Sequence, residues 1–447
     1  MKVLLFHGYM LRGTGSNIYN ANLAPALARL GHEVHLLCQE RTVELEGVHI
    51  HNPDIHGLLP VYVKDPYPGF EVKTFPELSE VELERYLEAN VVAVREIAEQ
   101  VGGVDLALAN HLVMGPAILA RAGVAPYAAK IHGSALEYTV KPHPRFLPYA
   151  AEGMESAAAV LVGSRHTAES LWAALPGVDG LEAKTRLGPP GVDTVEFSPG
   201  GAREPLVVFV GKLIVSKGVD LLIAAWPLVR ARHPDARLQI AGFGAYEDGV
   251  RRLLAALDRG DLDEARAIAR LGWALEGGEE RSLPILARFL EQPPPGYVEA
   301  ARGIASSVEL IGRLEHDEVA RLLPHAEAMV MPSTFPEAFG MVAVEAAACG
   351  VLPVSAGHSG MLEVSRRLAE ALPPEIADLL SFPVREGAVE AIAERIGTWL
   401  DLAEPERETA RGQLVDTVAR HWSWEAVARG VLAAAAGELG GLPVPVG

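Results

Sequence analysis

The chain has 447 residues, too many for one ordinary hydrophobic core, and this length predicts two domains. Its composition is 49% hydrophobic and 22% charged, which is typical of a chain that folds throughout and excludes a disordered protein. Lys and Arg total 39 against 58 Asp and Glu, a net charge of −19. A protein this acidic repels phosphate backbones and anionic lipids, and we therefore expect no nucleic-acid partner. Any anionic substrate must be held by a few local cations.

Other classes are disfavoured by local features. Cys38 and Cys349 lie in apolar runs and are expected to be buried thiols, since two cysteines cannot form a disulfide framework. The first apolar run, residues 3–6, is short and is followed at once by glycines, so we expect no signal peptide. Because no apolar run approaches the ~18 residues of a membrane span, we expect no span and a cytoplasmic location.

The first elements in chain order form a βαβ unit. Residues 3–6 read as a strand buried on both faces, residues 8–17 as a glycine-rich loop, and residues 18–30 as a helix that Gly31 ends. Residues 34–37 read as the next strand. In such a unit a ligand is expected at the carboxyl ends of the strands.

The rest of the chain repeats the pattern. We expect a helix over 80–100, a long aperiodic loop over 57–76, and a second strand, glycine loop and helix opening at residue 206, with the domain boundary near Gly200. A mostly helical stretch over 247–306 follows. The further strands expected are 105–109, 128–131, 159–162, 206–210, 238–241, 308–311, 328–331 and 352–355, with helices up to Arg232 and over 316–323 and 339–349.

Two glutamates follow the strand at 328–331. Glu337 lies in a short loop, and Glu345 lies about two turns inside a helix that begins near Phe339. The start of a helix offers unpaired N–H groups to a diphosphate, a carboxylate within the helix can accept both ribose hydroxyls, and Glu337 can accept sugar hydroxyls. The alternative is one glutamate favoured by the helix dipole and one in solvent.

Two lysines lie in the loop after the strand at 206–210. A leaving diphosphate gathers negative charge, and Lys212 and Lys217 could stabilise it as a preorganised cation pair without a metal. The alternative is a pair of solvated surface lysines, which is the commoner fate of this residue type.

The ordered set of motifs resembles the retaining, family-four glycosyltransferases of the GT-B fold. The matching segments run from about residue 1 to 430 and include, besides the lysine loop and the two glutamates, Gly13-Thr14-Gly15, His132-Gly133-Ser134, Pro190-Gly191-Val192-Asp193, Ala241-Gly242-Phe243-Gly244, Gly312-Arg313-Leu314 and Ser423-Trp424-Glu425. Two departures stand out: Lys212 replaces a common Arg, which loses the bidentate fork but keeps the charge, and the stretch before Val308 is much longer than usual.

The resemblance implies an α/β architecture of two Rossmann-like, doubly wound domains facing a central cleft, with a C-terminal helix crossing back to the first domain. The expected parts are an acceptor-side domain over 1–200, a nucleotide-sugar domain over 201–425 with a helical insertion near 246–306, and a helix and tail over 426–447. The implied reaction moves a sugar from a nucleotide-diphosphate donor to an unidentified acceptor with retention, and needs no metal or other cofactor.

The resemblance also implies a role for each site residue. His132 would lie beside the anomeric centre, although by its sequence alone it could be a satisfied buried histidine. Glu337 would bind the transferred sugar. The donor would be bound by the loop containing Gly13 and Gly15, by Lys212 and Lys217 at the diphosphate, by Arg313 at the base, by the backbone of Phe339, Gly340 and Met341, and by Glu345 at the ribose.

Other candidates stay open. The spacing of His49, His51, Asp54 and His56 is ligand-like, but nothing completes a tetrahedral metal site, so solvated loop residues are expected. Acceptor-binding and surface-charge readings are equally open for Tyr62, Lys64, Tyr67, Tyr138, Lys141, His143, Arg145 and Arg165. The alternative functions are a sugar-nucleotide epimerase of the same fold and a silent sugar-nucleotide binder, which would have no need of both Glu337 and His132.

Overall fold

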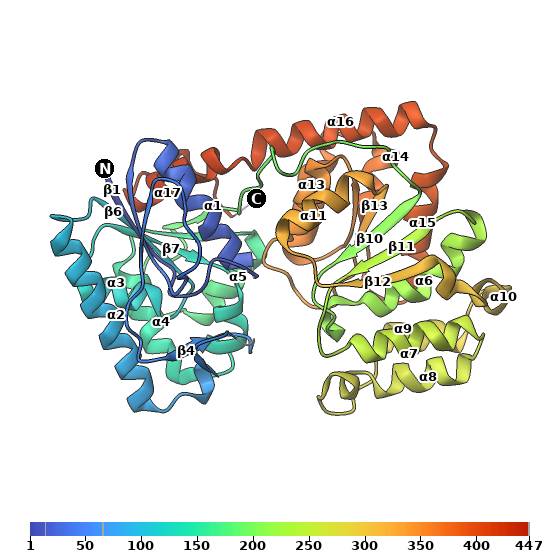
Figure 1. The fold of residues 1–447 in the computed structure, drawn as a ribbon, viewed down its shortest axis with the longest axis horizontal. Helices are drawn as coiled ribbons and strands as arrows, with labels where there is room; N and C mark the ends of the chain where they lie inside the picture. Colours follow the sequence, from blue (N-terminus) through green and yellow to red (C-terminus); the bar gives the residue numbers. More distant parts are fainter. Residues whose placement is uncertain (14, 65–66, 446–447) are drawn as a thin grey trace. The chain divides into compact units, whose positions relative to one another are not determined.

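The computed structural model describes residues 1–13, 15–64 and 67–445. The chain forms two compact units: one holds Met1–Gly191 together with the C-terminal segment from Trp422, and the other holds Val192–His421 (Figure 1). The boundary therefore falls between Gly191 and Val192, before the glycine pair near which we expected it.

The first unit is built on a seven-stranded parallel sheet with the order β3-β2-β1-β6-β7-β8-β9. Its central strands are mostly apolar and almost wholly buried, which suits a sheet covered on both faces. The order reverses between β1 and β6, where a doubly wound sheet places its ligands. The strands are β1 (Lys2–Phe6), β2 (Glu33–Leu37), β3 (Val48–His51), β6 (Leu106–Asn110), β7 (Tyr127–Ile131), β8 (Ala159–Val162) and β9 (Thr185–Leu187).

Two hydrophobic cores cover the two faces of this sheet. Leu4 and Phe6 belong to the core that includes α2, whereas Val3 and Leu5 belong to the core that includes α1 and α17. The returning C-terminal helix is thus part of the first unit, beginning at Trp424, and the Trp424 ring lies 5.5 Å from that of Tyr19. The helices are α1 (Gly15–Arg29), α2 (Glu80–Gln100), α3 (Gly115–Ala122), α4 (Leu147–Ser156), α5 (Arg165–Ala174) and α17 (Trp424–Ala435).

Two expectations for the first unit were wrong. Residues 57–76 are not one aperiodic loop, because β4 (Leu58–Val61) and β5 (Glu71–Thr74) pair in parallel. The apolar side chains of β4 face the core, but only four residues with a proline among them leave no visible period. Likewise His49 and His51 lie in the edge strand β3 rather than in a loop. Val48 and Ile50, which alternate with the histidines along the strand, pack against the core that includes α1.

The second unit contains a six-stranded parallel sheet with the order β12-β11-β10-β13-β14-β15, which reverses between β10 and β13. Its strands are β10 (Leu206–Val210), β11 (Arg237–Ala241), β12 (Val308–Gly312), β13 (Ala328–Met331), β14 (Leu352–Ala356) and β15 (Ser381–Phe382). Its helices are α6 (Val219–Arg232), α11 (His316–Leu322), α12 (Met341–Ala348), α13 (Ser359–Ala369), α14 (Pro374–Ala377), α15 (Ala388–Asp401), α16 (Glu404–His421) and those of the insertion.

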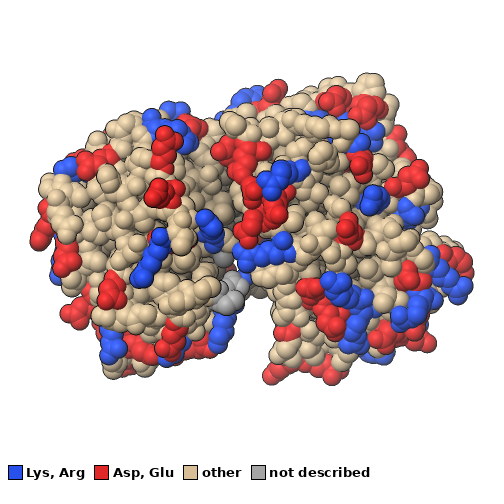
Figure 2. Space-filling view, viewed as in Figure 1, with Lys and Arg blue, Asp and Glu red and all other residues tan. Residues whose placement is uncertain are grey.

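The insertion over 247–306 is a helical layer of the second unit. It comprises α7 (Glu247–Asp258), α8 (Leu262–Leu271), α9 (Pro284–Glu291) and α10 (Tyr297–Ala301). Several of its arginines pair with neighbouring carboxylates, as in Arg252–Glu264 at 3.1 Å, and Figure 2 shows the two signs of charge side by side over these helices. This mixture lacks the single cationic face of a membrane-surface helix. None of the described helices combines the length and apolar character that a membrane crossing requires.

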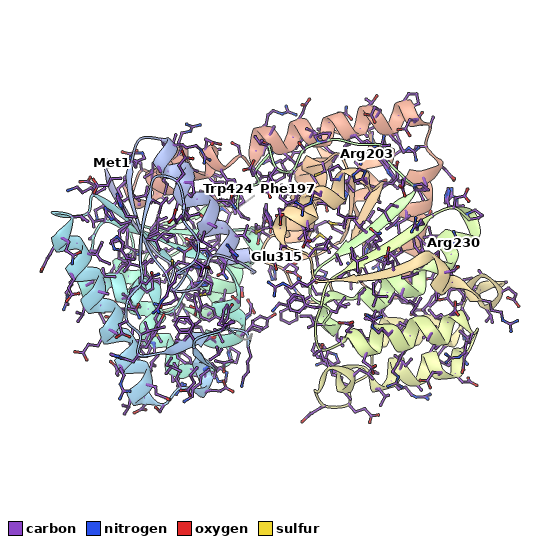
Figure 3. The ribbon with its side chains drawn as sticks, in the orientation of Figure 1. Met1, Phe197, Arg203, Arg230, Glu315 and Trp424 are labelled. Carbon is purple, nitrogen blue, oxygen red and sulfur yellow. The ribbon has the colours of Figure 1, made fainter. Side chains whose placement is uncertain are left out.

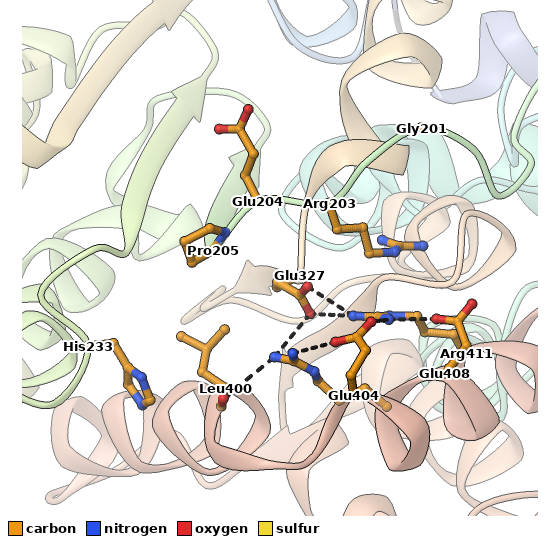
Figure 4. Close-up of a pocket in the computed structure, with 11 residues that line it drawn as sticks. Gly201, Arg203, Glu204, Pro205, His233, Glu327, Leu400, Glu404, Glu408 and Arg411 are labelled. Carbon is orange, nitrogen blue, oxygen red and sulfur yellow. Dashed lines mark hydrogen bonds and ion pairs between the residues drawn. The ribbon is translucent and has the colours of Figure 1, made fainter.

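A buried ion cluster lies at the opposite end of the second sheet from the loops with the predicted site residues. Glu327, just before β13, accepts two hydrogen bonds from Arg411 of α16, at 2.9 and 2.7 Å (Figure 4). It also accepts one from the indole of Trp399. Arg411 also pairs with Glu404 and Glu408. These groups line a cavity of about 510 Å³. Because each buried charge has its counter-charge, the cluster fastens α16 to the sheet.

Replacing Glu327 by Gln should lower the free energy of unfolding by about 2–4 kcal/mol, because it leaves Arg411 short of its buried counter-charge. The matched control is Glu408→Gln, which removes a carboxylate from the same arginine at an exposed position and should cost less than about 1 kcal/mol. Chemical denaturation measures both changes. Equal losses in the two variants would show that burial of Glu327 contributes nothing.

Candidate active site

The carboxyl edge of the second sheet brings together two loops that are far apart in the sequence. The loop after β10 carries Lys217, and the loop after β13 carries Glu337. The Lys217 ammonium lies 2.5 Å from Glu337 Oε1, which also accepts a hydrogen bond from the Ser333 hydroxyl at 2.7 Å. Two residues predicted from separate motifs therefore meet at the point where the strand order reverses.

Gly218 allows the two loops to approach this closely. Its φ is +66°, in the left-handed region, and a Cβ atom there would lie 2.0 Å from the carbonyl oxygen of Pro332. The contact is completed by the Thr334 N–H, which donates to the Ser216 carbonyl at 2.8 Å. A side chain at position 218 would push the lysine turn away from the glutamate loop.

The backbone of Glu337 is held by residues that the sequence motifs did not single out. Its N–H donates to the Ser359 hydroxyl at 2.9 Å, and its carbonyl accepts from the Gly360 N–H at 2.9 Å. His358 contacts both this hydroxyl and the Ser333 carbonyl. Ser359 has a φ of +53°, an uncommon conformation that is often found at functional sites. The signal available was a His-Ser-Gly sequence directly after β14, at the same sheet edge.

The helix after Glu337 begins later than expected. Its first residue is Met341 and its N-cap is Gly340, so Phe339 lies before the helix and is 8% exposed. The first N–H groups of a helix have no partner within it and carry partial positive charge. The helix start therefore suits an anion, although its boundary differs from the expected one by two residues.

Glu345 is buried within α12, with 5% of its surface exposed. Burial, together with the nearby Glu196 carboxylate, raises its pKa from 4.5 to about 8. Among the residues that the structure describes, none donates a hydrogen bond to this carboxylate. A buried carboxyl without such a donor has an unused capacity to bind hydroxyl groups.

Arg313 and Lys212 follow neighbouring parts of the same edge. Arg313, after β12, forms an ion pair with Glu315 at 3.0 Å (labelled in Figure 3), and its guanidinium carbon lies 5.1 Å from the centre of the exposed Phe243 ring. Lys212 lies directly after β10, in the loop whose Leu213 N–H donates to the Phe243 carbonyl at 2.8 Å. The motifs that follow β10, β11 and β12 thus converge.

His132 lies in the first unit, at the end of β7. Its Nε2 is 2.8 Å from the side-chain oxygen of Asn110. The side-chain NH2 group of Asn110 donates to the side-chain oxygen of Asn20, and the NH2 group of Asn20 contacts His7 Nδ1. Burial, together with the neighbouring His111, holds the pKa of His132 well below its usual 6.5. The ring is therefore a neutral imidazole at neutral pH.

His111 is the functional candidate that the sequence motifs missed in this unit. It follows β6, has a φ of +68°, and its ring lies 4.7 Å from that of Tyr62 and 4.9 Å from that of His132. Neither ring nitrogen has a hydrogen-bond partner among the described residues. Its position at the end of the strand beside β1 was the available signal.

The glycine loop of the first unit is described in part. Gly13 has a φ of +91°, and Gly15 is the first residue of α1. Thr14 lies outside the described residues, so the predicted closure of this loop over phosphates stays a prediction.

The basic side chains considered for the acceptor have partners within the first unit. Arg145 donates to three carbonyls around η1 (Phe75–Glu77), a structural role. Three further ion pairs are Lys64–Glu77, Lys141–Glu137 and Arg165–Glu169. His35 of β2 lies 3.0 Å from His51 of β3, and no group of three or more metal-binding side chains converges in the described residues.

Models of known protein families match most of the chain. Residues 13–196 match the model of Glycosyltransferase Family 4, and residues 204–274 and 298–411 match two models of glycosyl transferases group 1. The chain belongs to family four of the GT-B glycosyltransferases. Most of the described motifs that carry the resemblance follow strands of the two sheets, whereas Ser423-Trp424-Glu425 opens α17.

Individual relatives are distant. The GDP-mannose-dependent monoacylated alpha-(1-6)-phosphatidylinositol monomannoside mannosyltransferase of Corynebacterium glutamicum is 27% identical over 53% of this chain and 52% of its own length, so the match spans about half of that relative. D-inositol 3-phosphate glycosyltransferase of Actinosynnema mirum is 27% identical over 94% of this chain and 91% of its own. The crystal structure of Anabaena HepE in complex with UDP and glucose has a TM-score of 0.58 at 16% identity, covering 97% and 98% of the two chains, which shows the shared fold.

The raised pKa of Glu345 predicts a pH-dependent stability. Between pH 4.5, where the unfolded carboxyl ionises, and about pH 8, only the folded state keeps the proton, so the free energy of unfolding should fall as the pH rises. At about 1.4 kcal/mol per pKa unit, the fall relative to Glu345→Gln should reach a few kcal/mol. Chemical denaturation of both proteins from pH 5 to 8.5 measures it, and a constant difference would contradict the prediction.

Proposed function

We propose that the chain transfers a sugar from a nucleotide-diphosphate sugar to an acceptor, with retention of the anomeric configuration. The observation that carries the proposal is the meeting of Lys217, Glu337 and the start of α12 at the carboxyl edge of the second sheet, in a member of family four. Cations, a carboxylate and a helix start are the groups that a sugar diphosphate needs.

The donor would lie along this edge. Its diphosphate would take the N–H groups at Gly340 and Met341 and the ammonium groups of Lys212 and Lys217. Its ribose hydroxyls would donate to Glu345, which would then bind in its ionised form, because a carboxylate accepts such hydrogen bonds better than a carboxylic acid. The sugar would reach Glu337.

The ion pair between Lys217 and Glu337 suits this proposal. Without a donor each charge has the other as its partner, and the pair is accessible enough for both to exchange partners, with 34% and 25% of the side chains exposed. When a donor binds, the lysine would turn to the phosphate and the glutamate to the sugar hydroxyls. As the bond to the diphosphate breaks, negative charge would grow beside Lys217 and Lys212.

The first unit would present the acceptor and His132. A neutral imidazole beside the sugar would add no positive charge where the sugar ring itself becomes positive, and could still exchange hydrogen bonds with a hydroxyl. The names of the relatives support a nucleotide-sugar donor, because one is GDP-mannose-dependent and one solved structure holds UDP and glucose. They do not agree on a base, and we propose none.

The roles of the two glutamates can be separated by mutation. Glu345→Gln should weaken the affinity for the donor and for the free nucleoside diphosphate about ten- to hundredfold, because ribose binding is common to the ground and transition states. Glu337→Gln should instead lower kcat by a similar factor and leave nucleoside diphosphate affinity nearly intact. Calorimetry with UDP, GDP and ADP, beside steady-state kinetics, gives both quantities. The reverse pattern would overturn the donor pose, and donor turnover without any transferred sugar would favour the epimerase.

We also propose that transfer needs no bound metal, since the two lysines and the helix start supply the positive charge. Activity with excess chelator should remain within about twofold of the untreated enzyme. Loss of activity that Mg²⁺ or Mn²⁺ restores would mean that a metal, and not the lysine pair, stabilises the leaving diphosphate.

Replacing Lys217 by Ala should lower kcat at least about tenfold, since a charge-assisted hydrogen bond contributes about 1.5–3 kcal/mol.

A further inference from the structure

The insertion over 247–306 is anchored on α6, the helix that begins directly after Lys217 and Gly218. Tyr297 of α10 donates from its buried hydroxyl to the Ala224 carbonyl at 2.8 Å, and the Trp226 indole donates to Ser307 at 3.0 Å. Tyr297 lies within the insertion, and Ser307 directly follows it. The inserted helices therefore pack on α6 (Figure 1).

One segment of the insertion returns to the sheet edge. The 3-10 turn η5 (Trp273–Glu276) follows α8 and contacts Arg281 through Trp273. The Trp273 N–H donates to the Arg281 carbonyl at 3.1 Å, and the Arg281 guanidinium lies 4.2 Å from the Trp273 ring. Gly272 has a φ of +47°, and a Cβ there would lie 2.1 Å from the same carbonyl. The turn is thus closely fitted, and it ends at Glu276.

Glu276 reaches the lysine loop itself. Its Oε2 accepts a hydrogen bond from the N–H of Val215 at 2.8 Å. Val215 is buried and is the first residue of the 3-10 turn η4 (Val215–Lys217), whose own N-cap residue, Ile214, provides no side-chain acceptor. The insertion therefore supplies the cap that the turn lacks, as an N-cap side chain does for a helix.

The last residue of this capped turn is Lys217. Its ammonium contacts Glu337, and the Ser216 carbonyl accepts from Thr334, so η4 joins Glu276 on one side to the glutamate loop on the other. A shift of η4 would move Lys217 relative to Glu337 and to the start of α12. Preorganised cations lose their effect when they are displaced.

We propose that Glu276 is a positioning residue, through which the insertion fixes the lysine turn for the donor diphosphate. The inference rests on the proposed function, because it assigns Lys217 to the diphosphate. Glu276 acts through the Val215 N–H and touches no substrate. Its negative charge lies near an anion site and opposes binding there, so its contribution comes from the hydrogen bond and not from the charge.

The experiment compares three variants by calorimetry with UDP, GDP and ADP and by donor kinetics. Glu276→Ala should weaken nucleoside diphosphate affinity about five- to twentyfold, as expected when a buried N–H loses its acceptor. Glu276→Gln keeps an acceptor oxygen and should stay within about twofold of the unmodified chain or bind more tightly. Glu280→Ala, an exposed glutamate just beyond the same turn, should have no effect.

Kinetics beside thermal unfolding separate positioning from a loss of fold. In Glu276→Ala the KM for the donor should rise by the same factor as the dissociation constant and kcat should fall, though by less than in Lys217→Ala, while the thermal unfolding midpoint stays within about 3 °C. The proposal is overturned if Glu276→Ala binds as tightly as the unmodified chain, or if Glu276→Gln is as weak as Glu276→Ala. An unmodified chain that binds no nucleoside diphosphate would instead contradict the proposed function.

Discussion

The reversal of strand order between the neighbouring strands β10 and β13 is the constraint around which the second unit is organised. Where the strand order of a parallel sheet reverses, the connections that follow the two neighbouring strands run in opposite directions, so the two loops face each other with no crossing helix between them. In this chain the loops carry opposite charges, and the Lys217–Glu337 pair holds them together. The absent side chain of Gly218, the Ser216–Thr334 contact and the support from Ser359 all keep this pair in place.

The charged side chains at the two ends of that sheet differ in whether they have partners within the protein. At the amino ends, Glu327 and Arg411 are buried and mutually satisfied, so their charges fasten a helix and leave nothing for a ligand. At the carboxyl ends, Glu345 is buried with no donor among the described residues, and its pKa is raised. A carboxyl held in that state is unfavourable for the fold alone, and such sites are where perturbed pKa values gather for function.

The first unit follows a parallel design with neutral groups. Its sheet reverses between β1 and β6, and the side chains gathered there are amides and imidazoles with lowered pKa values rather than ion pairs. Hydrogen bonds run from His132 through Asn110 to Asn20, so the orientation of the histidine ring depends on residues of β6 and α1. Such a network fixes the orientation of the ring without charge, as the place proposed for His132 beside a positively charged sugar would require.

The sequence by itself determined most strands of the two large sheets and the residue types of the candidate site, because buried parallel strands are continuous apolar runs and strand-end motifs are local. The strands at 159–162, 206–210 and 328–331 and the helix at 80–100 were predicted with their observed bounds. The short strand β4 was not predicted, because its four residues include a proline and show no period. Only the tertiary structure decided which strand ends meet, and hence that Ser359 supports Glu337 and that Glu276 of the insertion caps the lysine turn. Those contacts join residues 22 and 61 positions apart, and no local pattern records a long-range hydrogen bond.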